Sequence, residues 1–333
     1  MSEESLNFVV APEQSGKRLD AFLAENIEKR SRSSIQKSID DGDVLVNGKT
    51  SKSSYKLREN DEIEVELTEE IVEGFTPEDI PLDIVYEDEF LAVINKPAGM
   101  VVHPGAGVPN GTLANAIAYH FKFQIPDSKL ESENISELES GIRNPESGIK
   151  NRIGIVHRLD KDTSGLIVIA KSDEIHEKLS EQFRNREVYK SYVALAHGEI
   201  YEENGTIDAP IAREKHNRTK MAVRAHGRNA VSLWSVRERF EKFTLLKVEI
   251  KTGRTHQIRV HLAHLNHPIV GDELYNAGRD KTVFNLTIRK AIEHLGRFFL
   301  HAERLSFTHP QTNEKMNFRV EIPSELSDFL ELL

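Results

Sequence analysis

The residues best suited to chemistry stand together at positions 157–162, where the letters HRLDKD place two carboxylates beside basic side chains. Thr163-Ser164-Gly165 follows as a turn, and Gly165 is free to take the positive φ that a sharp turn often needs. The run LIVIA at 166–170 is short, continuous and β-branched, which predicts a buried strand. Asp160 is therefore expected on a rigid loop facing a cleft, a usual location for catalytic groups.

A carboxylate in such a place can act as a nucleophile or as a base. It must be ionised to do so, and an unperturbed aspartate, with a pKa of about 3.9, is ionised at pH 7. Burial would raise that pKa, whereas a nearby arginine would lower it. The local sequence also allows a second interpretation, in which Asp160 only caps the turn.

A metal site is the first alternative to weigh, because histidines are frequent near position 260. Their spacings do not reproduce the pattern H-E-x-x-H, and no glutamate stands between a pair four apart. Helical histidines that face RNA or solvent are commoner, so no metal site is expected from His256, His261, His264 and His267.

Two nucleotide-dependent patterns also fail. The string at 157–160 differs from the kinase catalytic loop because Leu159 separates the arginine from the aspartate, and Gly165 stands where that loop needs asparagine. The glycines at 105–111 have the spacing GxGxxxG next to Pro104, which favours a tight turn over a dinucleotide-binding loop. No nucleotide cofactor is expected.

Length and composition favour a soluble protein of two domains. The chain has 333 residues, of which 38% are apolar and 29% charged. The absence of cysteine excludes disulfides, thiolate nucleophiles and cysteine-ligated metal clusters. The first ten residues lack the features of a secretory signal, and no run of 18 apolar residues occurs. We therefore expect a cytoplasmic protein that does not span or bind a membrane.

The charge is unevenly distributed. A net charge of −10 by itself argues against a polyanionic partner. Between positions 17 and 58, however, ten Lys or Arg stand against six Asp or Glu, whereas acidic residues cluster at 59–79 and 127–146. A basic module inside an acidic protein is compatible with nucleic-acid binding through that module.

The basic part predicts a small α/β module. Apolar residues at helical spacing indicate a helix over 17–30, and Ser31 can cap a second helix that ends near Ile39. Val44-Leu45-Val46 predicts a strand, and Asn47-Gly48 is a strong hairpin signal. On composition alone, these helices could equally be a solvated amphipathic pair.

The rest of the chain predicts a second, larger domain. Residues 73–81 are expected to be a linker, and residues 126–150, acidic and without aromatic residues, a mobile loop inserted before the central motif. Strands dominate and few helices separate them regularly, which indicates an α+β fold with a mostly antiparallel sheet. The expected strands and helices are 84–86, 91–94, 112–121, 173–187, 190–196, 231–240, 244–250, 303–308, 317–322 and 323–331.

The basic module resembles the S-four-type RNA-binding domain, first known from a ribosomal protein. The matching residues are Lys17-Arg18-Leu19-Asp20, Ser31-Arg32-Ser33, Ile35, Gly42, Val44 and Val46-Asn47-Gly48-Lys49. The resemblance covers roughly residues 15–70 and implies a domain over residues 1–72. It implies RNA contacts through Lys17, Arg18, Arg32, Lys37 and Lys49.

The whole chain resembles the RluA/RluD-type family of RNA pseudouridine synthases. The most specific match is HRLDKDTSGLIVIAK at 157–171, supported in order by NKPAGMVVHP (95–104), KSYVAL (190–195), TGRTHQIRVHLAHLNHPIVGDELY (252–275) and LHAERLSFTHP (300–310). The resemblance implies a pseudouridine synthase fold for a catalytic domain over residues 82–333. It implies the isomerisation of uridine to pseudouridine in structured RNA, which needs neither a metal nor a cofactor.

The resemblance also assigns roles to single residues. Asp160 matches the catalytic aspartate, which leaves Asp162 as a turn-forming residue. Arg254 matches the arginine partner of that aspartate, and Tyr192 the aromatic residue that stacks on the target base and helps to remove its proton. Arg158 is expected to fill the space left by a flipped-out nucleotide. Further RNA contacts are expected from His157, Lys190 and His256.

Simpler roles compete with some of these assignments. Tyr192 could be ordinary sheet packing, and Arg158 and Arg254 could simply bind phosphate. The expected substrate is large-subunit ribosomal RNA, free or in a pre-ribosomal particle. Transfer RNA is the nearest alternative, and a non-catalytic ribosome-assembly factor or a base-excising glycosidase are alternatives of other classes.

Overall fold

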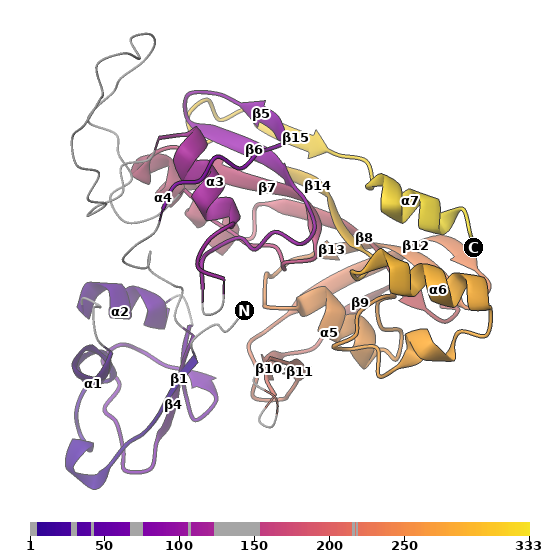
Figure 1. Cartoon of the computed structure of the whole chain (residues 1–333). Helices are drawn as coiled ribbons and strands as arrows, with labels where there is room; N and C mark the ends of the chain where they lie inside the picture. The colour runs from indigo at the N-terminus through magenta and orange to yellow at the C-terminus, as the bar shows by residue number, and fades with distance from the viewer. Residues whose placement is uncertain are drawn as a thin grey trace. The chain divides into compact units, whose positions relative to one another are not determined.

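The computed structural model describes residues 5–27, 32–40, 43–66, 76–105, 108–122, 154–214, 217 and 219–333. The chain forms two compact units, the first from residues 1–69 with 210–229, the second from 70–209 with 230–333 (Figure 1). The expected helix cap at Ser31, residues 73–75 of the expected linker at 73–81 and the expected loop at 126–150 lie outside the described residues. The domain boundaries proposed from the sequence stay predictions.

The first unit has the two expected helices and the expected hairpin. Its sheet has the order β1-β4-β2-β3, and its elements are β1 (Ser5–Val9), η1 (Pro12–Gln14), α1 (Leu19–Asn26), α2 (Arg32–Asp40), β2 (Val44–Val46), β3 (Lys49–Thr50) and β4 (Glu62–Glu66). Asn47 and Gly48 both have positive φ, 50° and 73°, as a tight two-residue hairpin requires. Leu19 and Phe22 of α1 and Ile35 of α2 pack in a common hydrophobic core.

A short hairpin from later in the chain groups with this unit. It consists of β10 (Ile211–Arg213) and β11 (Met221–Val223), which pair antiparallel. Arg228, just after the hairpin, forms an ion pair of 3.0 Å with Asp43. No sequence pattern indicated this association, because Asp43 and Arg228 are 185 positions apart.

The second unit is built on one large sheet. Among the described residues it has nine strands, in the order β5-β6-β7-β14-β8-β13-β12-β9 with β15 paired to β14. Its pairings are antiparallel except that between β7 and β14. The strands are β5 (Ile84–Glu87), β6 (Leu91–Lys96), β7 (Ser164–Ala170), β8 (Tyr189–His197), β9 (Asn204–Asp208), β12 (Val231–Phe240), β13 (Phe243–Ile250), β14 (Leu300–Thr308) and β15 (Lys315–Arg319).

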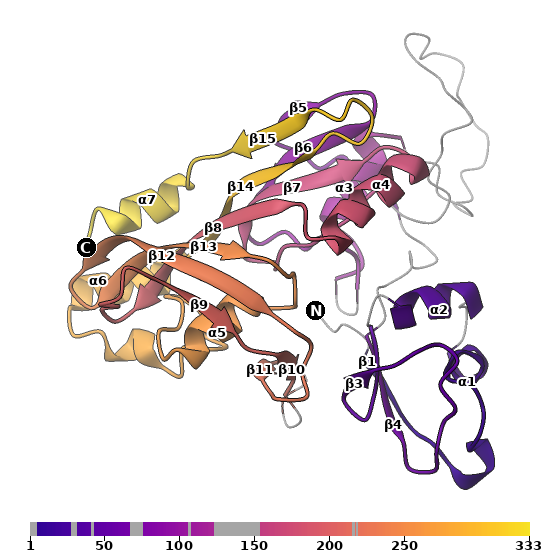
Figure 2. The ribbon, with the colours of Figure 1, turned by 180° about the vertical axis from the view of Figure 1, so that it is seen from behind.

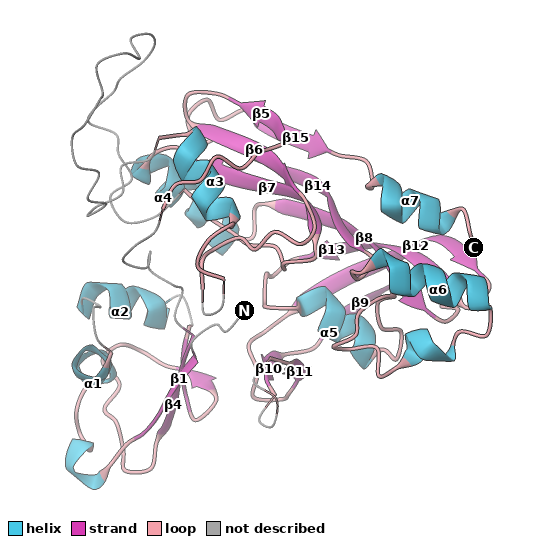
Figure 3. Cartoon of the chain, viewed as in Figure 1, coloured by secondary structure: helices cyan, strands magenta, loops and turns pink. Residues whose placement is uncertain are grey.

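The helices of the second unit pack along this sheet (Figures 2 and 3). They are α3 (Leu113–His120), α4 (Asp173–Arg184), α5 (Gln257–His264), η2 (Arg279–Thr282), α6 (Leu286–Leu295) and α7 (Ser324–Leu330). Ile175 and Leu179 of α4 pack on Leu166 and Val168 of β7. The α+β class and the largely antiparallel sheet are confirmed. No helix in the described parts of the chain is both long enough and apolar enough to span a membrane.

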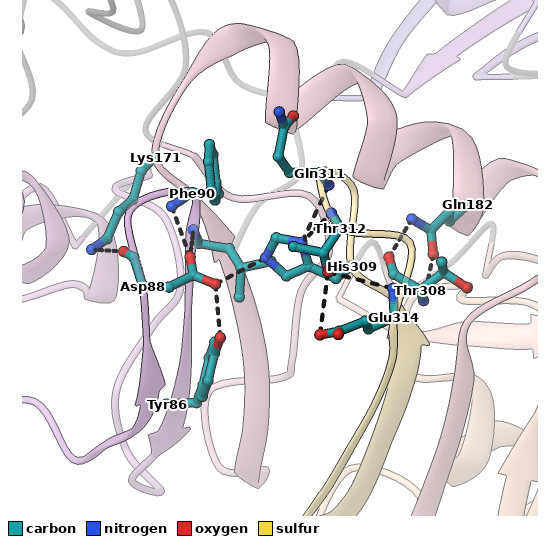
Figure 4. Close-up of polar contacts among 11 residues, drawn as sticks. Tyr86, Asp88, Phe90, Lys171, Gln182, Thr308, His309, Gln311, Thr312 and Glu314 are labelled. Atoms are coloured by element: carbon teal, nitrogen blue, oxygen red, sulfur yellow. Dashed lines mark hydrogen bonds and ion pairs between the residues drawn. The ribbon is translucent and has the colours of Figure 1, made fainter.

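A partly buried hydrogen-bond cluster ties the turn after β14 to the turn between β5 and β6 (Figure 4). His309 Nε2 lies 2.9 Å from Asp88 Oδ2, and its Nδ1 accepts from the backbone N–H of Gln311 and Thr312. Asp88 also accepts from the Tyr86 hydroxyl at 2.8 Å and from two backbone N–H groups of β6 and its approach. The cluster closes one end of the sheet.

Asp88→Asn is expected to destabilise the second unit by about 1–3 kcal/mol at pH 7, because buried donors lose their acceptor. Burial raises the pKa of Asp88, but its hydrogen bonds outweigh this and lower the pKa overall. A lowered folded-state pKa adds stability above the unfolded value of about 3.9 and loses it as the pH falls through the folded value. The free energy of unfolding in urea should thus be lower for Asp88→Asn than for the parent at pH 7, and the difference should be smaller near pH 3.

The control is Asp83→Asn, which changes an aspartate whose hydrogen bond to Asn95 is exposed. It should unfold within about 0.5 kcal/mol of the parent protein. An Asp88→Asn protein as stable as this control would contradict a stabilising role for the cluster.

Candidate active site

A pocket in the second unit collects residues from four separate stretches of the chain. They come from the turn before β7, from β8, from the stretch that runs from the end of β13 into α5, and from the start of β14. The lining consists of Arg158, Leu159, Asp160, Thr163, Tyr192, Ile250, Gly253, Arg254, Thr255, His256, Gln257, Ile258, Arg259 and Leu300. The structure thus brings together Asp160, Tyr192, Arg254, Arg158 and His256 of the predicted site.

The turn that carries Asp160 is rigidly mounted. The Thr163 N–H donates to the Asp160 carbonyl at 3.1 Å. The fully buried Lys96 donates from its Nζ to the Lys161 carbonyl at 3.0 Å and to two carbonyls of its own turn. Gly165 has φ +113°, and a Cβ there would lie 2.3 Å from the carbonyl oxygen of Ala302. Only glycine fits at this point, where β7 pairs with β14. The positive φ is the one that the turn pattern predicted for Gly165.

The ion pair to Asp160 comes from Arg259. Its Nη1 lies 3.0 Å from Asp160 Oδ2, while its Nε and Nη2 bind both carboxylate oxygens of Asp272 at 2.7 and 2.9 Å. A planar guanidinium held by two carboxylates in this way has one orientation. The family resemblance assigned the partner role to Arg254, and no sequence motif singled out Arg259 or Asp272. Arg254 lines the pocket, and its role stays a prediction.

Aromatic rings and a histidine complete the mounting of Arg259. Its guanidinium lies 4.3 Å from the ring centre of Phe298 and 5.0 Å from that of Tyr275. The Tyr275 hydroxyl is 2.8 Å from His256 Nδ1. His256 stands just before α5 in a left-handed conformation, φ 54°, which is uncommon for this residue and frequent at functional sites. The backbone there is shaped by the site.

The surroundings keep Asp160 ionised. Burial raises the pKa of Asp160, since it disfavours the charged form. The charges of His256, Arg259 and Arg158, with the hydrogen bond from Arg259, outweigh burial, and the pKa lies below its usual value. The carboxylate is 18% exposed and Arg259 is 8% exposed. A charged carboxylate therefore faces the pocket at neutral pH.

Tyr192 lies on β8 and lines the same pocket. Burial raises the pKa of its phenol, and the negative charge of Asp160 raises it further. The phenol is therefore protonated at neutral pH and poorly suited to accept a proton. This environment favours the predicted stacking role over the predicted help in proton removal.

His157 and Lys190 contact the same ring of α4. The His157 ring stacks on Phe183 at 4.6 Å between centres, and Lys190 Nζ lies 5.3 Å from the centre of that ring. His157 Nε2 accepts from the Val168 N–H, and burial lowers the pKa of His157 to about 3. Burial and the charge of Arg254 lower the pKa of Lys190 to about 8. His157 is thus a neutral packing residue, and its contact with RNA stays a prediction.

The RNA-binding residues predicted in the first unit lie on or beside its two helices and its hairpin. Arg18 and Arg32 are both paired with the buried Asp20, at 3.0 and 3.1 Å, and both remain about half exposed. Lys17 pairs with Glu25, and Lys49 is exposed on β3. Lys37 lies on α2, and its side chain is outside the described residues. Their contacts with RNA stay predictions.

Three of the four histidines that raised the metal question have different hydrogen-bond partners. His256 contacts Tyr275, whereas His261 lies between Ser232 Oγ and the Ala209 carbonyl, at 2.9 Å from each. His267 Nδ1 lies 2.8 Å from the carbonyl of His197. These contacts give two of the histidines roles in joining α5 and the segment after it to the sheet.

Comparison with known proteins identifies the family. A family model described as RNA pseudouridylate synthase matches residues 90–264, and one described as S4 domain matches residues 17–63. "Uncharacterized RNA pseudouridine synthase YlyB" of Bacillus subtilis (strain 168) is 39% identical over 328 residues, 98% of each chain. "Ribosomal large subunit pseudouridine synthase D" of Xanthomonas campestris is 41% identical over 334 residues, 99% of this chain and 93% of that relative.

Solved structures agree with the fold. The chain is similar to "Human RNA Pseudouridylate Synthase Domain Containing 1", with a TM-score of 0.53 and 25% identity over 76% of this chain and 89% of that one. It is also similar in fold to "Human RNA Pseudouridylate Synthase Domain Containing 4", with a TM-score of 0.54. The chain therefore belongs to the RNA pseudouridylate synthase family and is an RNA pseudouridine synthase with an S4 domain in front.

Proposed function

We propose that this pseudouridine synthase modifies large-subunit ribosomal RNA. The proposal rests on two supports, the full-length similarity to relatives named for the large ribosomal subunit and the S4 domain, which adds a second RNA-binding unit. The same resemblance had favoured ribosomal over transfer RNA. The enzyme acts in the cytoplasm, on free RNA or on a pre-ribosomal particle.

The mechanism depends on the ion pair between Asp160 and Arg259 in a pocket that also contains Tyr192. Asp160 is the catalytic carboxylate, since it is ionised, faces the pocket and is fixed by its turn. The target uridine enters the pocket and stacks on Tyr192. Arg259 keeps the carboxylate charged when the bound base excludes water, because a buried carboxylate without a partner would take up a proton.

The target nucleotide reaches the pocket by flipping out of the RNA. Flipping costs a few kcal/mol of stacking and pairing, which the protein must offset. Arg158 is exposed, lines the pocket and stands two residues before Asp160. It takes the place of the flipped nucleotide and binds the adjacent backbone.

The reaction balances without any co-reactant. The bond between ribose C1′ and uracil N1 breaks, the retained base rotates, and a bond forms between C1′ and C5. The proton on C5 leaves, and N1 gains one. Asp160 is the nucleophile or base of this rearrangement, and nothing is oxidised or reduced.

A deletion strain tests the substrate. Pseudouridines in ribosomal and transfer RNA are mapped by carbodiimide modification and reverse-transcription stops, with and without a plasmid copy of the gene. Specific sites in large-subunit RNA should disappear on deletion and return with the plasmid. Loss confined to transfer RNA, or no loss at all, would overturn the proposed substrate.

A further inference from the structure

The connection between η2 and α6 carries an aromatic side chain with no cover. Phe284 is 100% exposed and Leu286, two residues later, is 58% exposed. A single exposed apolar residue needs no explanation. Phenylalanine is, however, among the residues that folding most often buries. Two exposed apolar side chains so close in the sequence, one in the connection and one at the start of α6, indicate a surface that another molecule covers.

This connection is held in a fixed shape. Asn285 caps α6, its Oδ1 accepting from the N–H groups of Thr287 at 2.9 Å and Ile288 at 3.3 Å. Asp280 anchors η2 to the sheet through His197, at 2.6 Å, and through the Gly271 N–H. Phe284 therefore stands between a capped helix and an anchored turn. Ordering this protein segment on binding a ligand would cost little conformational entropy.

The sequence on both sides of Phe284 is positively charged although the chain as a whole is acidic. Residues 279–290 contain four cationic side chains and one acidic one. The acidic side chain, Asp280, is 14% exposed and bonded to His197. Lys281 and Lys290, which precede and follow Phe284 in the sequence, are both exposed. An aromatic face between cations suits single-stranded nucleic acid, whose bases stack and whose phosphates are negative.

The chain just before this connection contacts two residues that line the catalytic pocket, Arg259 and His256. Asp272 binds Arg259, and Tyr275 contacts both Arg259 and His256. From Tyr275 the chain runs to Phe284 in nine residues, with Asp280 anchored between them. A nucleotide at Phe284 would therefore bind the segment that orients the catalytic ion pair.

We propose that Phe284, with Lys281 and Lys290, is a stacking platform for an unpaired nucleotide of the substrate RNA, outside the catalytic pocket. The proposal rests on the proposed function for its substrate. It adds a contact in the catalytic unit to those expected from the S4 domain. A protein partner would use the same exposed apolar surface, and the test below distinguishes the two.

The chain offers a matched control. Tyr201, between β8 and β9, is 80% exposed. It differs in its charge, because Glu199, Glu202 and Glu203 surround it in sequence. If exposure of an aromatic ring were enough for RNA binding, Tyr201→Ala and Phe284→Ala would have equal effects.

The experiment uses the full chain and an in vitro transcript of large-subunit ribosomal RNA. Fluorescence anisotropy gives Kd. Phe284→Ala should raise Kd about tenfold, the loss expected for one stacked base. Phe284→Trp should bind like the parent, and Tyr201→Ala should stay within about twofold. The double variant Lys281→Ala/Lys290→Ala should reduce the slope of log Kd against log salt concentration by about one to two, the loss expected for one or two phosphate contacts.

A Phe284→Ala protein that binds the transcript within twofold of the parent would overturn the platform, and so would an equal loss in Tyr201→Ala. A protein-docking surface predicts the first of these results. The outcomes separate the two proposals. If gene deletion leaves the pseudouridines of large-subunit RNA in place and Phe284→Ala still weakens binding to the transcript, the substrate proposal fails and the platform stands. If deletion removes those pseudouridines and Phe284→Ala binds normally, the platform alone fails.

Discussion

Asp160→Asn is expected to abolish pseudouridine formation, lowering the rate by about 10³-fold or more, because loss of a catalytic nucleophile or base has effects of that size. The amide has the shape of the carboxylate but neither its charge nor its basicity. The substitution leaves the turn, the Lys96 hydrogen bonds and the S4 domain in place. RNA affinity should therefore change less than about threefold. Tritium release from RNA labelled at C5 of uridine measures the rate.

Asp162→Asn is the matched control for this variant. Asp162 is the other carboxylate of the same turn, two residues away. It should retain activity within a few-fold of the parent. Residual activity of Asp160→Asn above a tenth of the parent value would contradict a catalytic carboxylate at this position. If Asp160→Asn also lost RNA binding, a second substitution, Asp160→Ala, would be needed to separate the effect on binding from the effect on chemistry.

Arg259→Gln is expected to lower activity by about 10²-fold or more and to move the acidic limb of the pH–rate profile upward. Arg259 lowers the pKa of Asp160 both by its charge and by its hydrogen bond, so its removal raises that pKa. A higher pKa means that Asp160 is protonated over more of the acidic range. The same change leaves the carboxylates of Asp160 and Asp272 without their cation, at a cost of about 3–5 kcal/mol in stability. Activity against pH and urea unfolding measure the two effects.

Comparison with Arg254→Gln decides between the two arginines. If Arg259 is the partner of Asp160, Arg254→Gln leaves the acidic limb in place. Arg259→Lys should fail to restore activity, because a compact ammonium cannot bridge two carboxylates as a planar fork does. A shifted limb in Arg254→Gln together with an unshifted one in Arg259→Gln would return the role to Arg254.

The strands with strong local patterns were predictable from the sequence. The apolar run at 166–170 became β7, and the Asn-Gly pair became a tight hairpin, because burial and turn conformation are set by adjacent residues. Helix α6 was missed although its sequence is amphipathic, and only Ile292 of that helix is buried. Strands β10 and β11, of three residues each, are too short for a periodic signal.

The sequence by itself determined which residue types stand at the candidate site, since the motif around Asp160 and the other matched stretches are local patterns. Only the tertiary structure showed that Arg259 reaches Asp160, because Asp160 is 99 positions before it in the chain. That contact depends on where α5 begins, on the left-handed turn at His256 and on Asp272, which fixes the guanidinium from the other side. Such long-range contacts follow from the packing of distant segments, and the spacing of residues in the chain does not contain them.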